Sequence, residues 1–217
     1  MNKTLTYKDH SARVIITDPA DHQEKNWVEG NWYEPNLLDD LYDMSNPAYN
    51  FYDIGASIGN HSVFASVICG MNVVAFEPHR RSFRQLTENL FINGITAIPL
   101  PILLSSGAKR YSPEHPPDNN VGMNRYVPSS GSGSVSQSSA LDDWVGVLPP
   151  PDIIKIDVEG MEKEVLIGAA KTLELSRPIL YIEIIGDTHE IDVYLSRFGY
   201  ERTAVFNHTP TYRYEAE

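Results

Sequence analysis

Short apolar runs and amphipathic segments alternate along the chain from about residue 50 onward. The apolar runs have the length of β-strands and lie at 50–55, 72–77, 152–157 and 178–184, with a broken run at 96–104. Between them, hydrophobic residues recur every three or four positions, which is typical of helices that bury one face. Strands that alternate with helices indicate a mostly parallel sheet covered by helices on both faces. We therefore predict an α/β fold.

The other elements are predicted from the same periodicities and from residues that start or end helices. Pro35 suits the first turn of a helix, and Gly70 and Gly199 suit helix ends. We expect helices at 34–44, 60–70, 80–94, 162–175 and 189–199, and further strands at 4–8, 12–17, 201–207 and 210–215. We expect the mostly parallel sheet to include an antiparallel C-terminal strand.

The segment from 105 to 140 interrupts this alternation. It contains the proline-rich stretch SPEHPPDNN and the serine- and glycine-rich stretch PSSGSGSVSQSS. Two interpretations are open: a flexible connection with a weak hairpin in VGMNRYV, or a substrate loop on the ligand side of the sheet. We predict one domain over 1–217, with N-terminal strands and a helix (1–46), a first half that binds the ligand (47–104), this insertion, and a second half (141–217).

Charge and cysteine content argue against several classes of protein. The chain of 217 residues has 17 basic and 29 acidic side chains, a formal net charge of −12. Such a protein is poorly suited to a nucleic-acid backbone or an anionic membrane surface. Cys69 is the only cysteine, which excludes an intramolecular disulfide and a cysteine-ligated zinc site. We see no signal segment and no membrane-spanning run, and we expect a soluble, cytoplasmic protein.

The stretch FYDIGASIGNHSVFA places two glycines between an apolar strand and a helix. In parallel α/β sheets, ligands bind beyond the carboxyl ends of the strands, where this turn lies. Gly55 and Gly59 let a backbone pass close to a ligand, and the helix from Asn60 offers free N–H groups. The spacing is not that of a P-loop or of a regular dinucleotide fingerprint. Asp53 before the turn would repel a pyrophosphate but suits a cationic ligand.

Glu77, at the end of the next strand, is the second indication of a ligand. It follows the turn by about twenty residues, where a carboxylate can accept hydrogen bonds from both hydroxyls of a ribose. Together, the turn and Glu77 fit S-adenosylmethionine (SAM). NAD remains an alternative on these residues alone.

Further acids follow the later strands at the same edge of the sheet. Asp157 emerges from an apolar strand, Glu159 follows it, and Glu183 comes near the end of the next strand. A carboxylate here could offset a sulfonium charge or act as a general base, and Asp157 is the first choice for the base. Together with Asp142, these acids could also hold a divalent cation through oxygen ligands. The alternative is that Asp157 or Glu159 only caps the following helix.

Other polar residues are weaker candidates. His61, His115 and His189 could act as bases, although packing or solvent exposure is the simpler interpretation of each. Asn89 is interpreted as a surface residue of its helix. Leu104 and its neighbours in PLPILLSS follow the third strand, where an adenine ring lies in folds of this kind.

Four segments resemble the FkbM family of class I methyltransferases. They are DIGASIGNHS, AFEPHRRSFRQLTENLFING, IIKIDVEGMEKEVLIGAAKTL and RPILYIEI. The resemblance covers about residues 30–200. Two positions depart from the family pattern, with Ser57 in place of an asparagine and His79 in place of a small polar residue or asparagine.

The resemblance implies a Rossmann-like class I methyltransferase fold and SAM-dependent methyl transfer to a hydroxyl or carboxyl oxygen of a sugar or secondary metabolite. The expected partner is a small-molecule or glycan acceptor, not nucleic acid or membrane. A non-catalytic SAM-binding protein and an NAD-dependent oxidoreductase are the alternatives. A divalent cation is an additional candidate cofactor, with no ligand set assigned. The residues expected to bind SAM are Asp53, Gly55, Ala56, Ser57, Gly59, Asn60, Glu77, Pro78, Leu104 and Asp157, and those expected to be catalytic are Asp157, Glu159 and Glu183.

Overall fold

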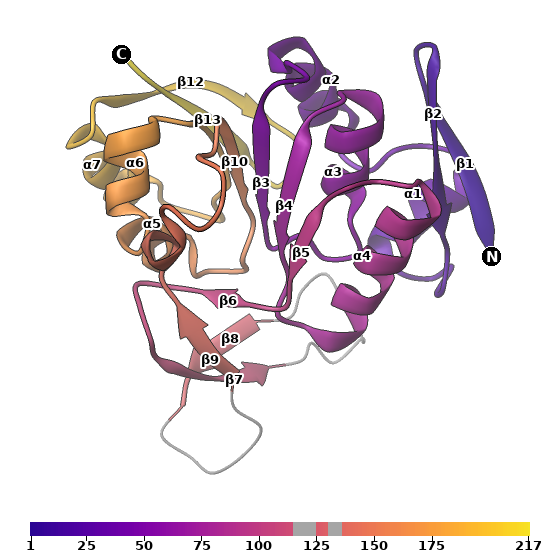
Figure 1. Cartoon of the computed structure of the whole chain (residues 1–217). Helices are drawn as coiled ribbons and strands as arrows, with labels where there is room; N and C mark the ends of the chain where they lie inside the picture. The colour runs from indigo at the N-terminus through magenta and orange to yellow at the C-terminus, as the bar shows by residue number, and fades with distance from the viewer. Residues whose placement is uncertain (115–124, 130–135) are drawn as a thin grey trace.

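The computed structural model describes residues 1–114, 125–129 and 136–217. Its main sheet contains β3 (Asn50–Ile54), β4 (Asn72–Phe76), β5 (Ile98–Leu100), β10 (Ile153–Ile156), β11 (Ile179–Glu183), β12 (Tyr200–Phe206) and β13 (Thr211–Ala216). The seven strands lie in the order β12-β13-β11-β10-β3-β4-β5 (Figure 1). The strands from β11 to β5 are parallel, and β13 is antiparallel to both of its neighbours. The predicted mostly parallel sheet with an antiparallel C-terminal strand is confirmed.

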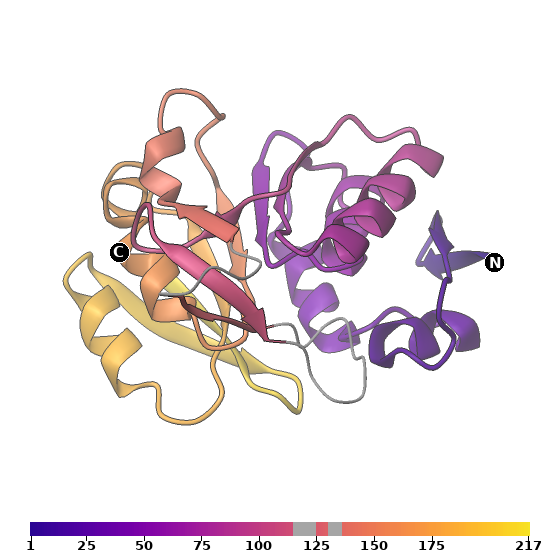
Figure 2. The same ribbon diagram turned by 90° about the horizontal axis from the view of Figure 1, so that it is seen from below.

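Helices cover both faces of this sheet, as predicted. One group consists of α1 (His22–Glu29), α2 (Pro35–Met44), α3 (Asn60–Val63) and α4 (Arg80–Ile92), and the other of α5 (Glu162–Ile167), α6 (Ala170–Ser176) and α7 (His189–Ser196) (Figures 1 and 2). The sheet has a hydrophobic core on each face, and successive strand residues point into opposite cores. Phe51 packs with the first group of helices, and its neighbour Tyr52 packs with the second. Among the described residues, no helix is both long and apolar enough to cross a membrane.

Two of the predicted helices have irregularities. The helix expected at 60–70 begins as α3 and continues as a π-helix over Phe64–Ile68. The helix expected at 162–175 is divided at Gly168 into α5 and α6. A Cβ atom on Gly168 would lie 2.0 Å from the Ser105 carbonyl oxygen. The division therefore allows close contact with the chain that leaves the main sheet.

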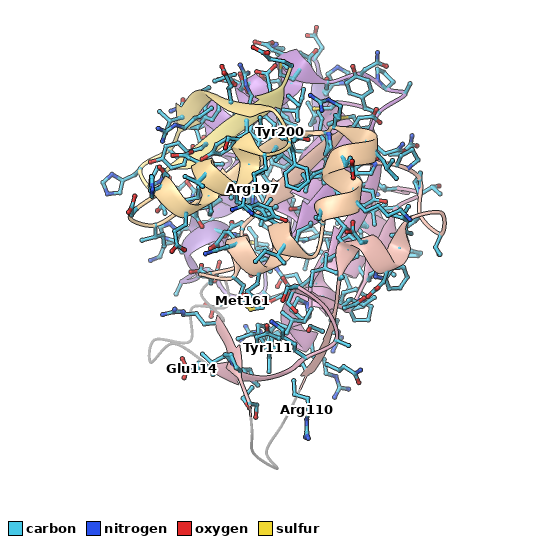
Figure 3. All side chains as sticks on the ribbon, turned by 90° about the vertical axis from the view of Figure 1, so that its left-hand side faces the viewer. Arg110, Tyr111, Glu114, Met161, Arg197 and Tyr200 are labelled. Carbon is cyan, nitrogen blue, oxygen red and sulfur yellow. The ribbon has the colours of Figure 1, made fainter. Side chains whose placement is uncertain are left out.

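The insertion contributes a second, smaller sheet. It contains β6 (Leu103–Leu104), β7 (Arg110–Glu114), β8 (Arg125–Pro128) and β9 (Ser136–Ser139), in the order β6-β9-β7-β8. In the described part, β8 pairs with β7. The hairpin predicted within VGMNRYV falls mostly on residues 121–124, which lie outside the described residues. Leu103, Tyr111 and Met161 form an apolar cluster that joins this sheet to the loop after β10 (Figure 3).

The N-terminal hairpin packs against α4 through a buried amide. The two strands predicted here form as β1 (Asn2–Tyr7) and β2 (His10–Ile15), and they pair antiparallel. Asn89 of α4 is fully buried. Its Oδ1 accepts the Ile15 N–H at 2.7 Å, and its Nδ2 donates to the Ile58 carbonyl at 2.8 Å. The interpretation of Asn89 as a surface residue was wrong, because its partners come from distant parts of the chain.

The carboxyl ends of β3 and β10 are in unusually close contact. A Cβ atom on Gly55, just after β3, would lie 1.8 Å from the Asp157 carbonyl oxygen, just after β10. Gly55 also has a φ of +84°. Only glycine fits this place, because it needs both a left-handed backbone and the absence of a side chain.

We therefore predict that Gly55→Ala destabilises the protein by about 3 kcal/mol or more, since a steric overlap adds to the backbone strain. Gly146→Ala is the matched control, because Gly146 has a φ of +82° but no atom within 4 Å of its Cβ position. Gly146→Ala should lower the free energy of unfolding only by the backbone strain, about 1–2 kcal/mol. Urea unfolding measures both, and equal losses would contradict the close contact.

Candidate active site

The turn after β3 is fastened to the end of β4. The N–H groups of Gly55 and Ala56 both donate to the Phe76 carbonyl, each at 3.0 Å. The Ser57 N–H donates to Glu77 Oε2 at 2.8 Å. Ser57 itself has a left-handed φ of 49°. The glycine turn and Glu77, predicted from sequence as two separate features, thus form one hydrogen-bonded unit.

Glu77 has a buried carboxylate with two backbone donors. Besides the Ser57 N–H, the His79 N–H donates to its Oε1 at 2.7 Å. Burial raises the pKa of Glu77 to about 7, although the two N–H groups act to lower it. A carboxylate oxygen can accept more than one hydrogen bond. Glu77 therefore keeps capacity for two hydroxyl donors.

A pocket with an empty volume of about 580 Å³, its open mouth included, lies between Glu77 and Asp157. This is within the size range of small-molecule sites. Its walls combine acids with an apolar surface suited to a flat ring. The apolar part consists of Ile54, Phe76, Ile102, Leu103, Leu104, Tyr126 and Val158.

Three acids meet beside this pocket. Asp157, Glu159 and Glu183 each offer a carboxylate oxygen, and these oxygens lie within 4.8 Å of one another. Burial and the Asp157 charge raise the pKa of Glu183 to about 9 and that of Glu159 to about 7. Glu183 is therefore protonated at neutral pH, and it shares its proton in a hydrogen bond with Asp157.

Lys155 supplies a buried positive charge to this group of acids. Its Nζ donates to Asp157 Oδ2 at 2.9 Å, and its side chain is 3% exposed. Burial acts to lower the pKa of Lys155, but the charges of Asp157, Asp53 and Glu34 raise it overall. Burial likewise acts to raise the pKa of Asp157, but Lys155 and the Glu183 hydrogen bond lower it overall. Asp157 therefore stays ionised.

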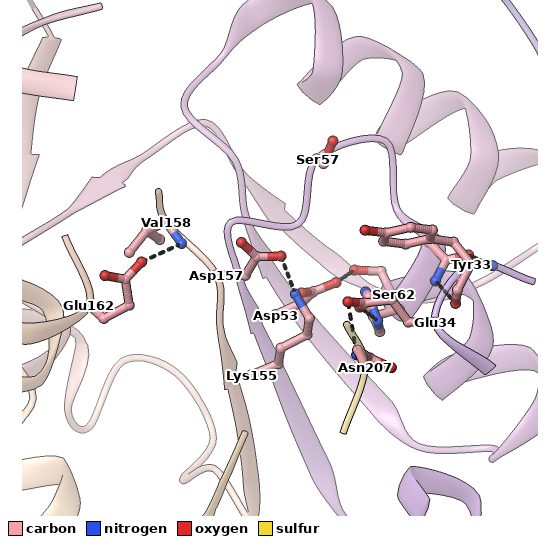
Figure 4. A network of polar contacts seen from close by, with 12 residues as sticks. Tyr33, Glu34, Asp53, Ser57, Ser62, Lys155, Asp157, Val158, Glu162 and Asn207 are labelled. Carbon is pink, nitrogen blue, oxygen red and sulfur yellow. Dashed lines mark hydrogen bonds and ion pairs between the residues drawn. The ribbon is translucent and has the colours of Figure 1, made fainter. Parts of the chain in front are cut away.

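A buried polar network lies behind the acids (Figure 4). Asp53 pairs in register with Lys155 on the neighbouring strand, and its Oδ2 accepts the Ser62 hydroxyl at 2.6 Å. Glu34 Oε2 lies 2.9 Å from the His61 Nε2. The other Glu34 oxygen accepts from Asn207 Nδ2 at 2.9 Å. This network links the first helices and the turn between β12 and β13 to the site.

Several of the residues predicted to bind the cofactor line the pocket: Gly55, Ser57, Glu77, Pro78, Leu104 and Asp157. Asp53, Ala56, Gly59 and Asn60 do not line it. Asp53 is fully buried behind the pocket. Gly59 precedes α3, and its Cβ would lie 2.7 Å from Leu86 Cδ1.

Asn60 serves as an anchor for the segment before α2. Its Oδ1 accepts from Trp27 Nε1 at 3.1 Å and from the Tyr33 N–H at 3.2 Å. Its Nδ2 donates to the Tyr33 carbonyl at 3.1 Å. These bonds use both acceptor sites of the amide oxygen and one of the two N–H donors, so the structure gives Asn60 a packing role on the segment before α2.

The remaining sequence candidates lie in different places. His61 belongs to the buried network with Glu34, whereas His189 is exposed at the start of α7. His115 lies outside the described residues. Asp142 accepts the N–H groups of Lys171 and Thr172 at the start of α6, so it does not join the group of three acids.

Sequence reasoning missed Tyr126, Gln23 and the role of Lys155. Lys155 had a signal, since it is the one charged residue in an otherwise apolar strand. No sequence pattern marks Tyr126, because its place beside Glu77 depends on how β8 pairs with β7.

A sheet with β13 inserted antiparallel between β12 and β11, together with the glycine turn after β3 and the acids at one edge, is the arrangement of class I methyltransferases. The comparison with protein families specifies it further, because residues 53–202 match the Methyltransferase FkbM domain. That match covers more than half of the chain, and the chain belongs to the FkbM methyltransferase family.

A curated relative is the hexuronic acid methyltransferase AglP of Haloferax volcanii. It is 38% identical over 125 residues, which are 57% of this chain and 51% of AglP. The chain thus matches about half the length of this relative.

Solved structures share the fold. An FkbM methyltransferase from Methylobacillus flagellatus KT superposes with a TM-score of 0.55 at 20% identity, over 84% of this chain and 50% of that one. The ribosomal protein L11 methylase of Lactobacillus delbrueckii subsp. bulgaricus gives 0.53 at 15% identity, over 85% and 79%. At these identities the likeness concerns the fold alone.

The raised pKa of Glu77 predicts a pH dependence of cofactor binding. Below about pH 7, Glu77 takes up a proton and one oxygen no longer accepts a ribose hydroxyl freely. The dissociation constant of S-adenosylhomocysteine should therefore rise as the pH falls from 8 to 6, by at most about tenfold per unit. Calorimetric titration measures this.

Glu77→Gln is the control, since it keeps the shape and does not titrate. We expect this variant to bind weakly and with no slope over the same pH range. A wild-type affinity that is constant from pH 8 to 6, or an equal slope in the variant, would contradict the assignment of Glu77 to the ribose.

Proposed function

We propose that this chain is a SAM-dependent O-methyltransferase that acts on an acidic sugar. The observation that supports it most strongly is the placement of Glu77 on one side of the pocket and of Asp157 and Glu159 on the other. Family membership supports methyl transfer, and the name of the relative AglP supports a hexuronic acid as acceptor. The acceptor is then a small sugar or a glycan.

The residues of the pocket fit SAM. Glu77 would hold the ribose hydroxyls, and the apolar wall around Leu104 and Tyr126 would receive the adenine. The ionised Asp157 would attract the cationic end of the cofactor. SAM supplies a methyl group that is already activated by its sulfonium, so the protein has to provide alignment, exclusion of water and removal of a proton.

We assign the general base to Glu159 and an electrostatic role to Asp157. A base works best when its pKa lies near the operating pH, and the pKa of Glu159 is raised by burial to about 7. Asp157 was the first choice from sequence, but its ion pair with Lys155 makes it a weaker base. Glu159 also has a left-handed φ of 54°, a costly conformation for a side chain of this size and common at active sites.

A sugar hydroxyl is the acceptor oxygen that this arrangement favours. A hydroxyl loses a proton during attack and so makes use of a base, whereas a carboxylate nucleophile needs none. A carboxylate would also have to approach the ionised Asp157. We propose that no metal is needed, because Lys155 already offsets the Asp157 charge and Glu183 retains its proton. We further propose a cytoplasmic location, with the lone thiol of Cys69 buried in the core.

Transfer of labelled methyl groups from SAM to a panel of uronic acids and neutral sugars tests this function. We expect incorporation into a uronic acid by the wild type. Glu159→Gln should lower kcat about 100-fold or more, the usual contribution of a general base, and should remove the limb of the pH–rate profile near pH 7. Its affinity for S-adenosylhomocysteine should stay within about threefold of the wild type.

Three results would contradict this proposal. If the limb of the pH–rate profile near pH 7 persists in Glu159→Gln and is lost in Asp157→Asn, the general base is Asp157. Near-normal turnover of both variants would identify a carboxylate acceptor. Cofactor binding without transfer to any sugar would favour the alternative of a non-catalytic SAM-binding protein.

A further inference from the structure

A second hollow adjoins the proposed cofactor pocket at Glu159. Its empty volume is about 1050 Å³, open solvent included. Glu159 lines both hollows, so they meet at the proposed base. The walls consist of Arg125, Glu159, Gly160, Glu162, Lys163, Glu183, Ile184, Ile185, Asp187, Glu190 and Ile191, which we call the acceptor groove.

Most charged groups of the acceptor groove are already engaged. Lys163 Nζ donates to Glu190 Oε2 at 2.7 Å. Glu162 Oε1 accepts the N–H groups of Gly160 at 2.9 Å and Val158 at 3.4 Å. Glu183 is hydrogen-bonded to Asp157. Three acids of the groove, Glu162, Glu183 and Glu190, therefore have partners supplied by the protein.

Arg125 is the cation of the groove that has no such partner among the described residues. Its side chain forms no ion pair or hydrogen bond with another described residue. Its Nη2 lies 3.3 Å from the position that a Cβ on Gly160 would take, and Gly160 has a φ of +96°. A glycine at this place thus leaves room for the guanidinium beside Glu159, whose pKa the Arg125 charge acts to lower.

We propose that the acceptor groove binds the acidic sugar and that Arg125 pairs with its carboxylate. This rests on the proposed function and adds the residue that selects the substrate. A guanidinium offers a planar pair of donors that matches the two oxygens of a carboxylate. An anionic sugar would otherwise meet mainly acidic walls.

A sugar whose carboxylate pairs with Arg125 can still present a hydroxyl to Glu159. Arg125 begins β8, and its guanidinium lies against Gly160, the residue that follows Glu159. A sugar held there by its carboxylate would extend a ring hydroxyl toward Glu159. The anion stays next to the cation, and the reacting oxygen lies next to the base.

Binding of 4-nitrophenyl glucuronide and 4-nitrophenyl glucoside, measured by NMR titration with S-adenosylhomocysteine at saturation, tests this proposal. Arg125→Gln should raise the dissociation constant of the glucuronide about tenfold or more, as expected for a charge-assisted pair. The constants of the glucoside and of S-adenosylhomocysteine should not change. Arg125→Lys should restore part of the preference for the glucuronide.

Arg110→Gln is the matched control. Arg110 is an exposed residue of the same small sheet, and its side chain is not part of the groove wall (Figure 3). Arg110→Gln removes the same charge, but outside the groove wall. The dissociation constants of both sugars should therefore not change.

The outcomes separate this proposal from the proposed function. The role of Arg125 would be overturned if Arg125→Gln weakened the binding of both sugars equally, or if it still bound the glucuronide tightly. An effect of Arg110→Gln on glucuronide binding as large as that of Arg125→Gln would also overturn it. Binding of S-adenosylhomocysteine with binding of neither sugar would overturn the acceptor groove and leave the cofactor site standing. Failure of the wild type to bind S-adenosylhomocysteine would overturn the proposed function itself.

Discussion

The ion pair between Lys155 and Asp157 is the interaction on which the acidic edge of the sheet depends. Parallel strands end at the same edge, so acids at or just beyond the ends of β10 and β11 are necessarily brought together. A buried carboxylate without a partner costs several kcal/mol. The Lys155 ammonium, 2.9 Å from Asp157, offsets this cost and decides the charge state of the group. Asp157 stays ionised, and Glu183 keeps its proton.

The same edge connects the fold to the cofactor pocket. The Asp157 carbonyl packs against Gly55, and the turn that starts at Gly55 holds Glu77 through the Ser57 N–H. The acids on the two sides of the pocket are therefore fixed relative to each other by backbone contacts. Groups that are positioned before the substrate arrives need no reorganisation during the reaction, which is a large part of electrostatic catalysis.

The fold and the strand-end acids could be predicted from sequence because both rest on local patterns. Strands buried on two faces are continuous apolar runs, and Glu77, Asp157 and Glu183 stand at or just beyond their ends. The burial of Asn89 could not be predicted, since its partners come from distant segments. Asp53 was expected to touch the cofactor, but cross-strand register places it behind the pocket with Lys155. Arg125 could not be placed because the insertion lacks a clear periodicity.

Equilibrium unfolding of Lys155→Met in urea at pH 7 tests the dependence on Lys155 most directly. Methionine retains much of the side-chain length and removes the charge, so we predict a loss of about 3–5 kcal/mol in the free energy of unfolding. Lys163→Met is the matched control, because Lys163 is 47% exposed in its pair with Glu190 and should lose about 0–1 kcal/mol. A loss for Lys155→Met as small as that of the control would contradict the account. It would show that the buried acids are held in a neutral form without the cation.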